Sequence, residues 1–160
     1  MPNRRRFLLS DLVADRATAA YEEHARRIIE RLPRAEVRHV GGTSVAGVLT
    51  TGDVDLQVRV TTAEFPAARD ALAELYEPLY PESWHESAYF QAPASDPPVE
   101  LALTVIGTAD DRCHGESWQR IASDSVLIEK YNALKRAHEE GALAEYQAAK
   151  RTFFAENFGH

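Results

Sequence analysis

The sequence predicts a mixed α+β domain in which helices flank a small mixed β-sheet and a helical region follows it. Apolar residues have helical spacing before Pro33, alternate with polar residues in 53–60, and return to helical spacing after Gly107. The order of elements is helix, strand, turn, strand, helix, two strands and then helices. Together these observations predict an α+β fold.

The first half of the chain supplies a helix and two strands. Asp15 is a favourable helix cap, and the helical spacing that follows it stops at Pro33. Val37–Val40 is a short strand before a Gly-Gly turn. Asp53–Val60 is a second strand, with valines and a leucine on one face and polar side chains on the other.

The remaining elements continue this order. Thr61 or Thr62 caps a helix whose apolar stripe runs from Phe65 to Leu79. Strands follow at 88–92 and 99–106, separated by the proline-rich turn 93–98. After Gly107 the spacing is helical to the end, and Gly141 separates two helices.

Length and composition predict one domain over residues 1–160, with a sheet-containing core at 1–110 and C-terminal helices at 111–160. The net charge, 18 − 25 = −7, argues against extensive nucleic-acid binding. Cys113 is the only cysteine, so no intrachain disulfide can form. The apolar run at 7–9 is too short for a signal peptide, and no run reaches the roughly 20 residues that span a bilayer. We therefore expect a cytoplasmic protein without a membrane partner, in which Arg4–Arg6 is a solvated tail.

Two aspartates open the second strand on one face. Asp53 and Asp55 alternate with Val54, which places their backbones about 7 Å apart on the polar face. Two such carboxylates repel each other unless a cation lies between them, and Mg²⁺ combines a few protein carboxylates with substrate phosphates. The pair therefore favours a magnesium site over a solvated strand face.

A glycine-rich turn precedes this strand. Gly41 and Gly42 allow phosphate oxygens to approach backbone N–H groups, and Thr43 and Ser44 add hydroxyl donors. A tight turn would need the glycines even without a ligand. Beside a carboxylate pair, however, the turn indicates phosphoryl or nucleotidyl transfer.

These residues resemble a known pattern. A glycine-rich turn followed by Asp-x-Asp on a strand is similar to the nucleotidyltransferase superfamily of DNA polymerase β. The segment His39-Val40-Gly41-Gly42-Thr43-Ser44-Val45-Ala46-Gly47 more closely resembles the GrpB-like family, with Asp55 at that family's aspartate position. The helical segments 131–135 and 146–150 resemble the family's Tyr-x-x-Leu-Lys and Tyr-x-x-x-Lys helices.

The resemblance implies a nucleotidyltransferase-like fold and a third carboxylate on a neighbouring strand, for which Glu100 is the candidate. An exposed charge at the strand edge is an equal alternative for Glu100, and Asp96 is a weaker substitute. This chain has Thr51-Gly52 where the family has Lys-Pro, so one phosphate contact is in doubt. Asp53, however, restores the superfamily's pair of aspartates.

Other polar residues have structural interpretations that compete with functional ones. We expect His39 to be hydrogen-bonded at a strand end, and a zinc site at Cys113-His114 lacks the required ligands. The C-terminal aromatic residues are expected in the core. Lysines 130, 135 and 150 either line a phosphate-facing groove or lie on solvated helix faces.

The leading hypothesis is therefore a Mg²⁺-dependent, ATP-binding or other NTP-binding nucleotidyltransferase that moves a nucleoside monophosphate to an unidentified small-molecule or protein acceptor. Asp53, Asp55 and Glu100 would be its catalytic and metal-binding residues, and Gly41, Gly42, Thr43 and Ser44 would bind the nucleotide. The alternative is a nucleotide-binding or interaction module of the same fold with little turnover. A weaker possibility is a nucleotidyltransferase that modifies a partner protein.

Overall fold

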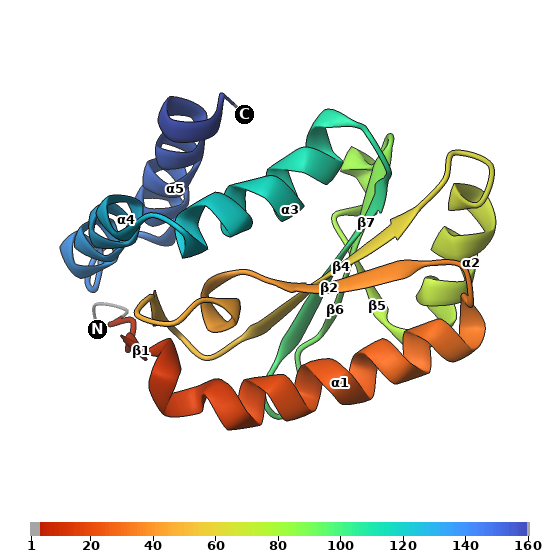
Figure 1. Ribbon diagram of the computed structural model, residues 1–160, viewed down its shortest axis with the longest axis horizontal. Coiled ribbons are helices and arrows are strands. Elements are labelled where there is room, and N and C mark those ends of the chain that lie inside the picture. Colours follow the sequence, from red (N-terminus) through yellow and green to blue (C-terminus); the bar gives the residue numbers. More distant parts are fainter. Residues whose placement is uncertain (1–3, 160) are drawn as a thin grey trace.

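A five-stranded mixed sheet forms the centre of the computed structural model, which describes residues 4–159 (Figure 1). The strand order is β2 (Glu36–Val40), β4 (Val54–Val60), β7 (Val99–Val105), β6 (Ser87–Ala92) and β5 (Glu77–Leu79). β4 and β7 are parallel, and the other neighbouring strands are antiparallel. The predicted small mixed sheet is therefore confirmed, with β4 in an interior position.

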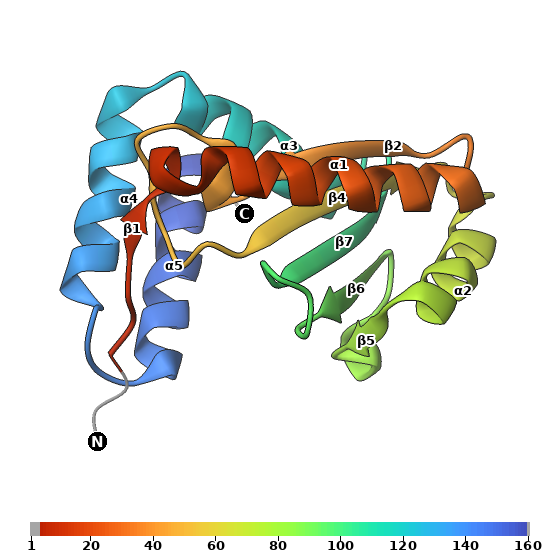
Figure 2. The same cartoon turned by 90° about the horizontal axis from the view of Figure 1, so that it is seen from below.

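The apolar face of the sheet packs on α1 (Ala14–Arg31) and α2 (Phe65–Leu75), which lie on one side of it in Figures 1 and 2. Val54, Leu56 and Val58 of β4 are fully buried there. Because side chains alternate along a strand, this burial directs the residues between them to the opposite face. The sequence pattern therefore correctly predicted which face of β4 is polar.

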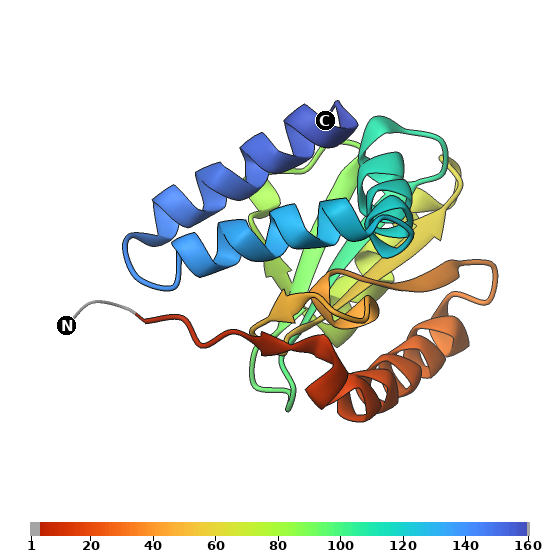
Figure 3. The same ribbon diagram turned by 60° about the vertical axis from the view of Figure 1, so that its left-hand side comes forward.

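Three helices lie on the polar side of the sheet: α3 (Ala109–Ala122), α4 (Ser125–Ala137) and α5 (Leu143–Phe158). Figure 3 shows α4 and α5 side by side and antiparallel. The prediction of only two helices, divided at Gly141, was wrong because the carboxylate of Asp124 caps a new helix by accepting from the amides of Val126 and Leu127 at 2.9 and 3.3 Å. Within residues 4–159, no helix has the length and apolarity needed to cross a membrane.

The ends of the first two helices differ slightly from the predictions. α1 begins at Ala14, so Asp15 lies in the first turn rather than at the cap. In the first turn its negative charge still interacts favourably with the helix dipole. Thr61 and Glu64 form a reciprocal capping box just before α2. α2 ends at Leu75, and Leu79 belongs to β5 instead of the helical stripe, because Pro78 cannot continue a helix.

A short second sheet joins the N-terminal segment to the loop that leads into β4. It pairs β1 (Leu8–Leu9) with β3 (Leu49–Thr50) in antiparallel register. Two 3₁₀ turns flank it, η1 (Ser10–Val13) and η2 (Gly42–Ser44), and a third, η3 (Pro81–Ser83), precedes β6. The sequence patterns did not predict β1 or β3, since two-residue strands show no periodicity.

Candidate active site

Two carboxylates lie side by side where β4 and β7 begin. In the parallel register Asp55 is opposite Glu100, and Val54 is opposite Val99. Neighbouring strands are about 4.8 Å apart, so these carboxylates share one small region of the polar face, with Asp53 just before β4. The predicted adjacency of the aspartate strand and the Glu100 strand is confirmed.

The carboxylates have raised pKa values because they are desolvated and close to one another. Burial, together with the charges of Glu100 and Asp53, raises the pKa of Asp55 to about 7. Partial desolvation and the Asp53 charge raise the pKa of Glu100, and desolvation raises that of Asp53. No ion pair with a basic side chain neutralises any of the three within residues 4–159. This region is therefore poised to accept a cation or a proton.

Gly41 is required by the position of Asp55. Its φ is 79°, in the left-handed region that favours glycine. A Cβ atom on Gly41 would lie 2.2 Å from Oδ2 of Asp55. The turn therefore places its backbone against the carboxylate, and any side chain at this position would displace it.

The polar side chains of the turn form internal hydrogen bonds. The Thr43 hydroxyl donates to the Asp53 carbonyl oxygen at 3.1 Å, so the 2.9 Å contact with His39 has Nε2 of the histidine as donor. The Ser44 hydroxyl donates to the Gly41 carbonyl oxygen. Burial lowers the pKa of His39, and its ring stacks on Tyr21. His39 thus has the expected structural contacts, and Thr43 ties the turn to the residue that opens the site.

Two lysines from the C-terminal helices bring positive charge to the carboxylates. Lys135 of α4 interacts electrostatically with Asp53 and Asp55, and Lys150 of α5 interacts with both aspartates and Glu100. Burial and the charge of Lys150 lower the pKa of Lys135 to about 8. Lys130, in contrast, is exposed. From the sequence, a phosphate-facing groove was only one of two alternatives for these lysines. The clearest sequence signal for Lys135 and Lys150 was their place in the two helical segments that resemble the family's Tyr-and-Lys motifs.

Asn132, one turn before Lys135, fixes α4 to the loop ahead of β4. Its side-chain oxygen accepts from the Leu49 amide, and its side-chain nitrogen donates to the Gly47 carbonyl, both at 2.8 Å. The amide side chain is buried and satisfies both of these backbone groups. Sequence reasoning missed this residue because an asparagine within a helix carries no distinctive pattern.

The donor set suits a hard, oxygen-seeking cation such as Mg²⁺. Asp53, Asp55 and Glu100 supply only carboxylate oxygens. Desolvation raises the pKa of all three, and the charges of neighbouring carboxylates add to this for Asp55 and Glu100, so a bound cation would stabilise their ionised forms. Within residues 4–159, no three His, Cys, Asp or Glu side chains form a ready-made ligand cluster. Magnesium commonly completes its shell with water and substrate phosphates, so one or two of these carboxylates are a sufficient protein contribution.

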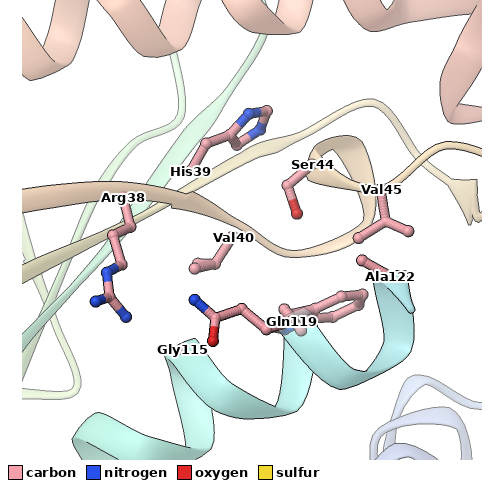
Figure 4. Close-up of a pocket in the computed structure, with 9 residues that line it drawn as sticks. Arg38, His39, Val40, Ser44, Val45, Gly115, Gln119 and Ala122 are labelled. Carbon is pink, nitrogen blue, oxygen red and sulfur yellow. The ribbon is translucent and has the colours of Figure 1, made fainter. Parts of the chain in front are cut away.

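A small cavity of about 140 Å³ lies between β2, the glycine-rich turn and α3 (Figure 4). Arg38, His39, Ser44 and Gln119 supply its polar lining. It is smaller than the roughly 300 Å³ at which ligand pockets usually begin, and none of the three carboxylates lines it. This cavity is therefore not a nucleotide pocket.

The remaining sequence candidates have structural contacts. Trp118 packs edge-on against Tyr131, which also packs against Phe153, so these aromatic residues form part of a core as expected. Asp96, the weaker substitute for Glu100, forms an exposed ion pair with Arg16.

Comparison with known proteins places this chain in a family. The GrpB protein family model matches residues 13–159, and the chain therefore belongs to the GrpB family. The crystal structure of the conserved protein GrpB from Enterococcus faecalis is similar, with a TM-score of 0.65 and 15% identity over 88% of this chain and 93% of that one.

Larger nucleotidyltransferases share the fold. The Cid1 poly(U) polymerase bound to MgGTP has a TM-score of 0.55 and 13% identity, and a cytoplasmic RNA terminal U-transferase has 0.52 and 16%. Each similarity covers 76% of this chain but only 41% and 38% of those chains. The fold is therefore nucleotidyltransferase-like, and the chain corresponds to less than half of these larger proteins.

Proposed function

We propose that the protein is a Mg²⁺-dependent nucleotidyltransferase that transfers a nucleoside monophosphate from an NTP to a small-molecule or protein acceptor. The observation that carries this proposal is the meeting of three carboxylates, a glycine turn and two lysines at one edge of the sheet. Membership of the GrpB family and the nucleotidyltransferase-like fold support it.

The carboxylates are assigned to the metal and to proton transfer. Asp53 and Asp55 would hold Mg²⁺, which supplies charge stabilisation at the reacting phosphate when bound. Glu100 would complete that site or take the proton from the acceptor hydroxyl, as its place beside Asp55 allows. The acceptor oxygen forms a bond to the α-phosphorus, and the bond to the pyrophosphate leaving group breaks.

The turn and the lysines are assigned to the triphosphate. Gly41 and Gly42 let phosphate oxygens approach the backbone, while the internal hydrogen bonds of Thr43 and Ser44 hold the turn in shape. Lys135 and Lys150 supply two positive charges that form no direct ion pair within residues 4–159. A triphosphate would neutralise them and separate them from the carboxylates that they now face.

Calorimetry with an α,β-methylene ATP analogue and with tripolyphosphate, each in MgCl₂, tests the assignment. We expect Asp55→Asn to abolish Mg²⁺-dependent binding and Lys150→Met to weaken it about tenfold or more. Glu77→Gln on β5 and Lys130→Met on α4, both at exposed positions, are matched controls that should leave binding unchanged. Binding that survives Asp55→Asn would refute the metal site. Tripolyphosphate removes any dependence on base preference.

A nucleotide-binding module with little turnover is the second candidate, and the lack of a ready-made metal cluster within residues 4–159 favours it. Mass spectrometry separates the two functions. A nucleoside monophosphate added to a co-purified protein or metabolite, and lost in Asp53→Asn, would establish transfer. Binding without any adduct or pyrophosphate release would support the module.

A further inference from the structure

The N-terminal residues 4–11, here called the strap, run along the α4–α5 pair to the loop that leads into β4 (Figures 2 and 3). The strap precedes the segment that matches the family model, which begins at residue 13. The sequence predicted a solvated tail for Arg4–Arg6. Arg4 and Arg6 are exposed as expected, but Arg5 is partly buried and bonded to the protein, so that prediction was wrong for Arg5.

Arg5 anchors one end of the strap. Its backbone amide donates to the Glu139 carbonyl at 2.7 Å, and its guanidinium donates to the carbonyls of His138 at 2.8 Å and Gly141 at 3.4 Å. These carbonyls lie at the C-terminal end of α4 and in the loop that follows, where the helix dipole favours a cation. The guanidinium also lies 4.9 Å from the centre of the Tyr146 ring.

The middle of the strap contacts the lysines of the site. The ammonium of Lys135 lies 5.1 Å from the Phe7 ring centre and 4.8 Å from that of Tyr131. Lys150 lies 4.6 Å from the centre of Tyr146, the ring that Arg5 also contacts. Aromatic faces attract such cations and limit where they can move. The ammonium of Lys135 thus contacts two aromatic rings, and Phe7 of the strap supplies one of them.

The other end of the strap is hydrogen-bonded to the loop and short strand that precede the aspartates. Leu8 pairs with Thr50, three residues before Asp53. The Ser10 amide donates to the Val48 carbonyl at 2.9 Å, and the Asp11 carboxylate accepts from the Gly47 amide at 2.8 Å. One continuous segment therefore contacts both the lysine-bearing helices and the loop that leads into the carboxylate-bearing strand.

We propose that the strap sets the position of Lys135 and Lys150 relative to Asp53 and Asp55, and that Arg5 is a positioning residue for binding the triphosphate group of the substrate. The triphosphate as ligand rests on the proposed function, whereas the positioning of the lysines by the strap does not. Arg5 acts through the helix end that it holds and through Tyr146, because its hydrogen bonds go to backbone carbonyls.

The test compares Arg5→Ala with Arg6→Ala, which removes the same charge from an exposed neighbour. Calorimetry with Mg²⁺ and tripolyphosphate should show about tenfold weaker binding for Arg5→Ala and less than about twofold for Arg6→Ala. Arg5→Lys keeps the charge at the helix end but lacks the fork that reaches two carbonyls, so it should recover only part of the binding lost in Arg5→Ala. Equal losses in the Arg5→Ala and Arg6→Ala variants, or full recovery in Arg5→Lys, would overturn the positioning role.

A spectroscopic measurement separates this inference from the proposed function. Lysine-labelled protein should show ring-current shifts of the Lys135 ε-methylene signal, which Arg5→Ala should reduce although Arg5 does not touch Lys135. An unchanged signal in Arg5→Ala would refute the strap even if triphosphate binds. Wild-type protein that binds no triphosphate would refute the proposed function while this signal still tests the strap. If Arg5→Ala does not fold, Phe7→Leu replaces it in the binding assay, where unchanged affinity would refute the strap.

Discussion

A buried or partly buried aspartate lies at each end of the polar face of β4: Asp55 at the start of the strand, and Asp111 of α3 at its end. The two aspartates differ in whether basic side chains balance their charge. At the end of the strand, Arg59 donates from Nε and Nη2 to the two carboxylate oxygens of Asp111 at 2.7 and 2.8 Å. Gln57 and Thr104 add further hydrogen bonds to the same carboxylate. At the start of the strand, Asp55 has only like-charged carboxylates beside it and lysines that form no direct ion pair with it.

The consequence is an opposite shift in the pKa of two aspartates on one side of one sheet. Burial alone would raise the pKa of Asp111, but hydrogen bonds from Arg59, Gly107 and Thr104 hold it at about 2. Burial and like charges raise that of Asp55 to about 7. A satisfied carboxylate anchors α3 to the sheet, whereas an unsatisfied one weakens the ligand-free fold and gains from a bound cation.

Breaking the satisfied end should have the largest effect on stability. Asp111→Ala leaves the partly buried guanidinium of Arg59 with Glu36 as its remaining ionic partner and removes the buried acceptor of the Thr104 hydroxyl, so we expect a loss of about 3–5 kcal/mol in the free energy of unfolding. Urea denaturation measures this loss. Glu116→Ala, an exposed change on the same helix, should stay within about 0.5 kcal/mol. A loss below 1 kcal/mol for Asp111→Ala would show that the network does not anchor α3.

At the unsatisfied end, Gly41→Ala is expected to cost about 2–3 kcal/mol, since a left-handed residue loses about 1–2 kcal/mol and Asp55 must also move. Gly52→Ala is the matched control because Gly52 has a φ of 97° but open space around a Cβ. Thermal denaturation should show a larger loss for Gly41→Ala, and only this variant should lose Mg²⁺-dependent binding. Equal losses would mean that the contact with Asp55 is unimportant.

The same comparison shows what the sequence could predict. Period-two alternation predicted the faces of β4, and the resemblance to the nucleotidyltransferase superfamily implied a carboxylate on a neighbouring strand, for which Glu100 was one of two equal interpretations; the parallel register places it opposite Asp55. Those features are local or concern neighbouring strands. The break before Ser125 depended on one cap, Asp124, whose local pattern was overlooked within a long helical stretch.

Long-range contacts account for most of what the sequence could not predict. The bond between Arg59 and Asp111 joins residues 52 positions apart, and the contact of Phe7 with Lys135 joins opposite ends of the chain. Helical spacing places a lysine on a helix face but not against a particular strand. The lysines, Asn132 and the strap therefore required the tertiary structure.

The pH dependence of stability should reverse between the two ends of β4. Asp55 retains its proton up to about pH 7 when folded, whereas an unfolded aspartate releases it near 3.8, so metal-free stability should fall as pH rises from about 4 to 7. For Asp111 the folded pKa is lower, and its contribution should be lost as pH falls from about 4 to 2. Asp55→Asn should remove most of the first change, which is at most about 4 kcal/mol because the pKa of Asp55 rises from 3.8 to about 7 and each pKa unit corresponds to about 1.4 kcal/mol.

Denaturant midpoints measured from pH 4 to 8 test this prediction, with and without MgCl₂. In wild-type protein Mg²⁺ should oppose the fall in stability toward pH 7, because it binds the ionised carboxylates. In Asp55→Asn both the slope and the Mg²⁺ effect should shrink. A slope that is unchanged in this variant would assign the titration to other groups.

Ser44→Ala should have the smallest effect and separates turn structure from ligand contact. The Ser44 hydroxyl donates to the Gly41 carbonyl, so its removal should cost about 1 kcal/mol of stability, the usual value for such a hydrogen bond. Ser123→Ala is a matched control, since its hydroxyl donates to the carbonyl three residues earlier at the end of α3. Both variants should lose similar stability, but only Ser44→Ala should weaken Mg²⁺–triphosphate binding in calorimetry, by about 1 kcal/mol or less, because its hydrogen bond holds the turn whose backbone would face the phosphates. Equal affinity in the two variants would mean that the Ser44 hydroxyl stabilises the turn but does not contribute to phosphate binding. Any contribution of the turn would then come from its backbone N–H groups.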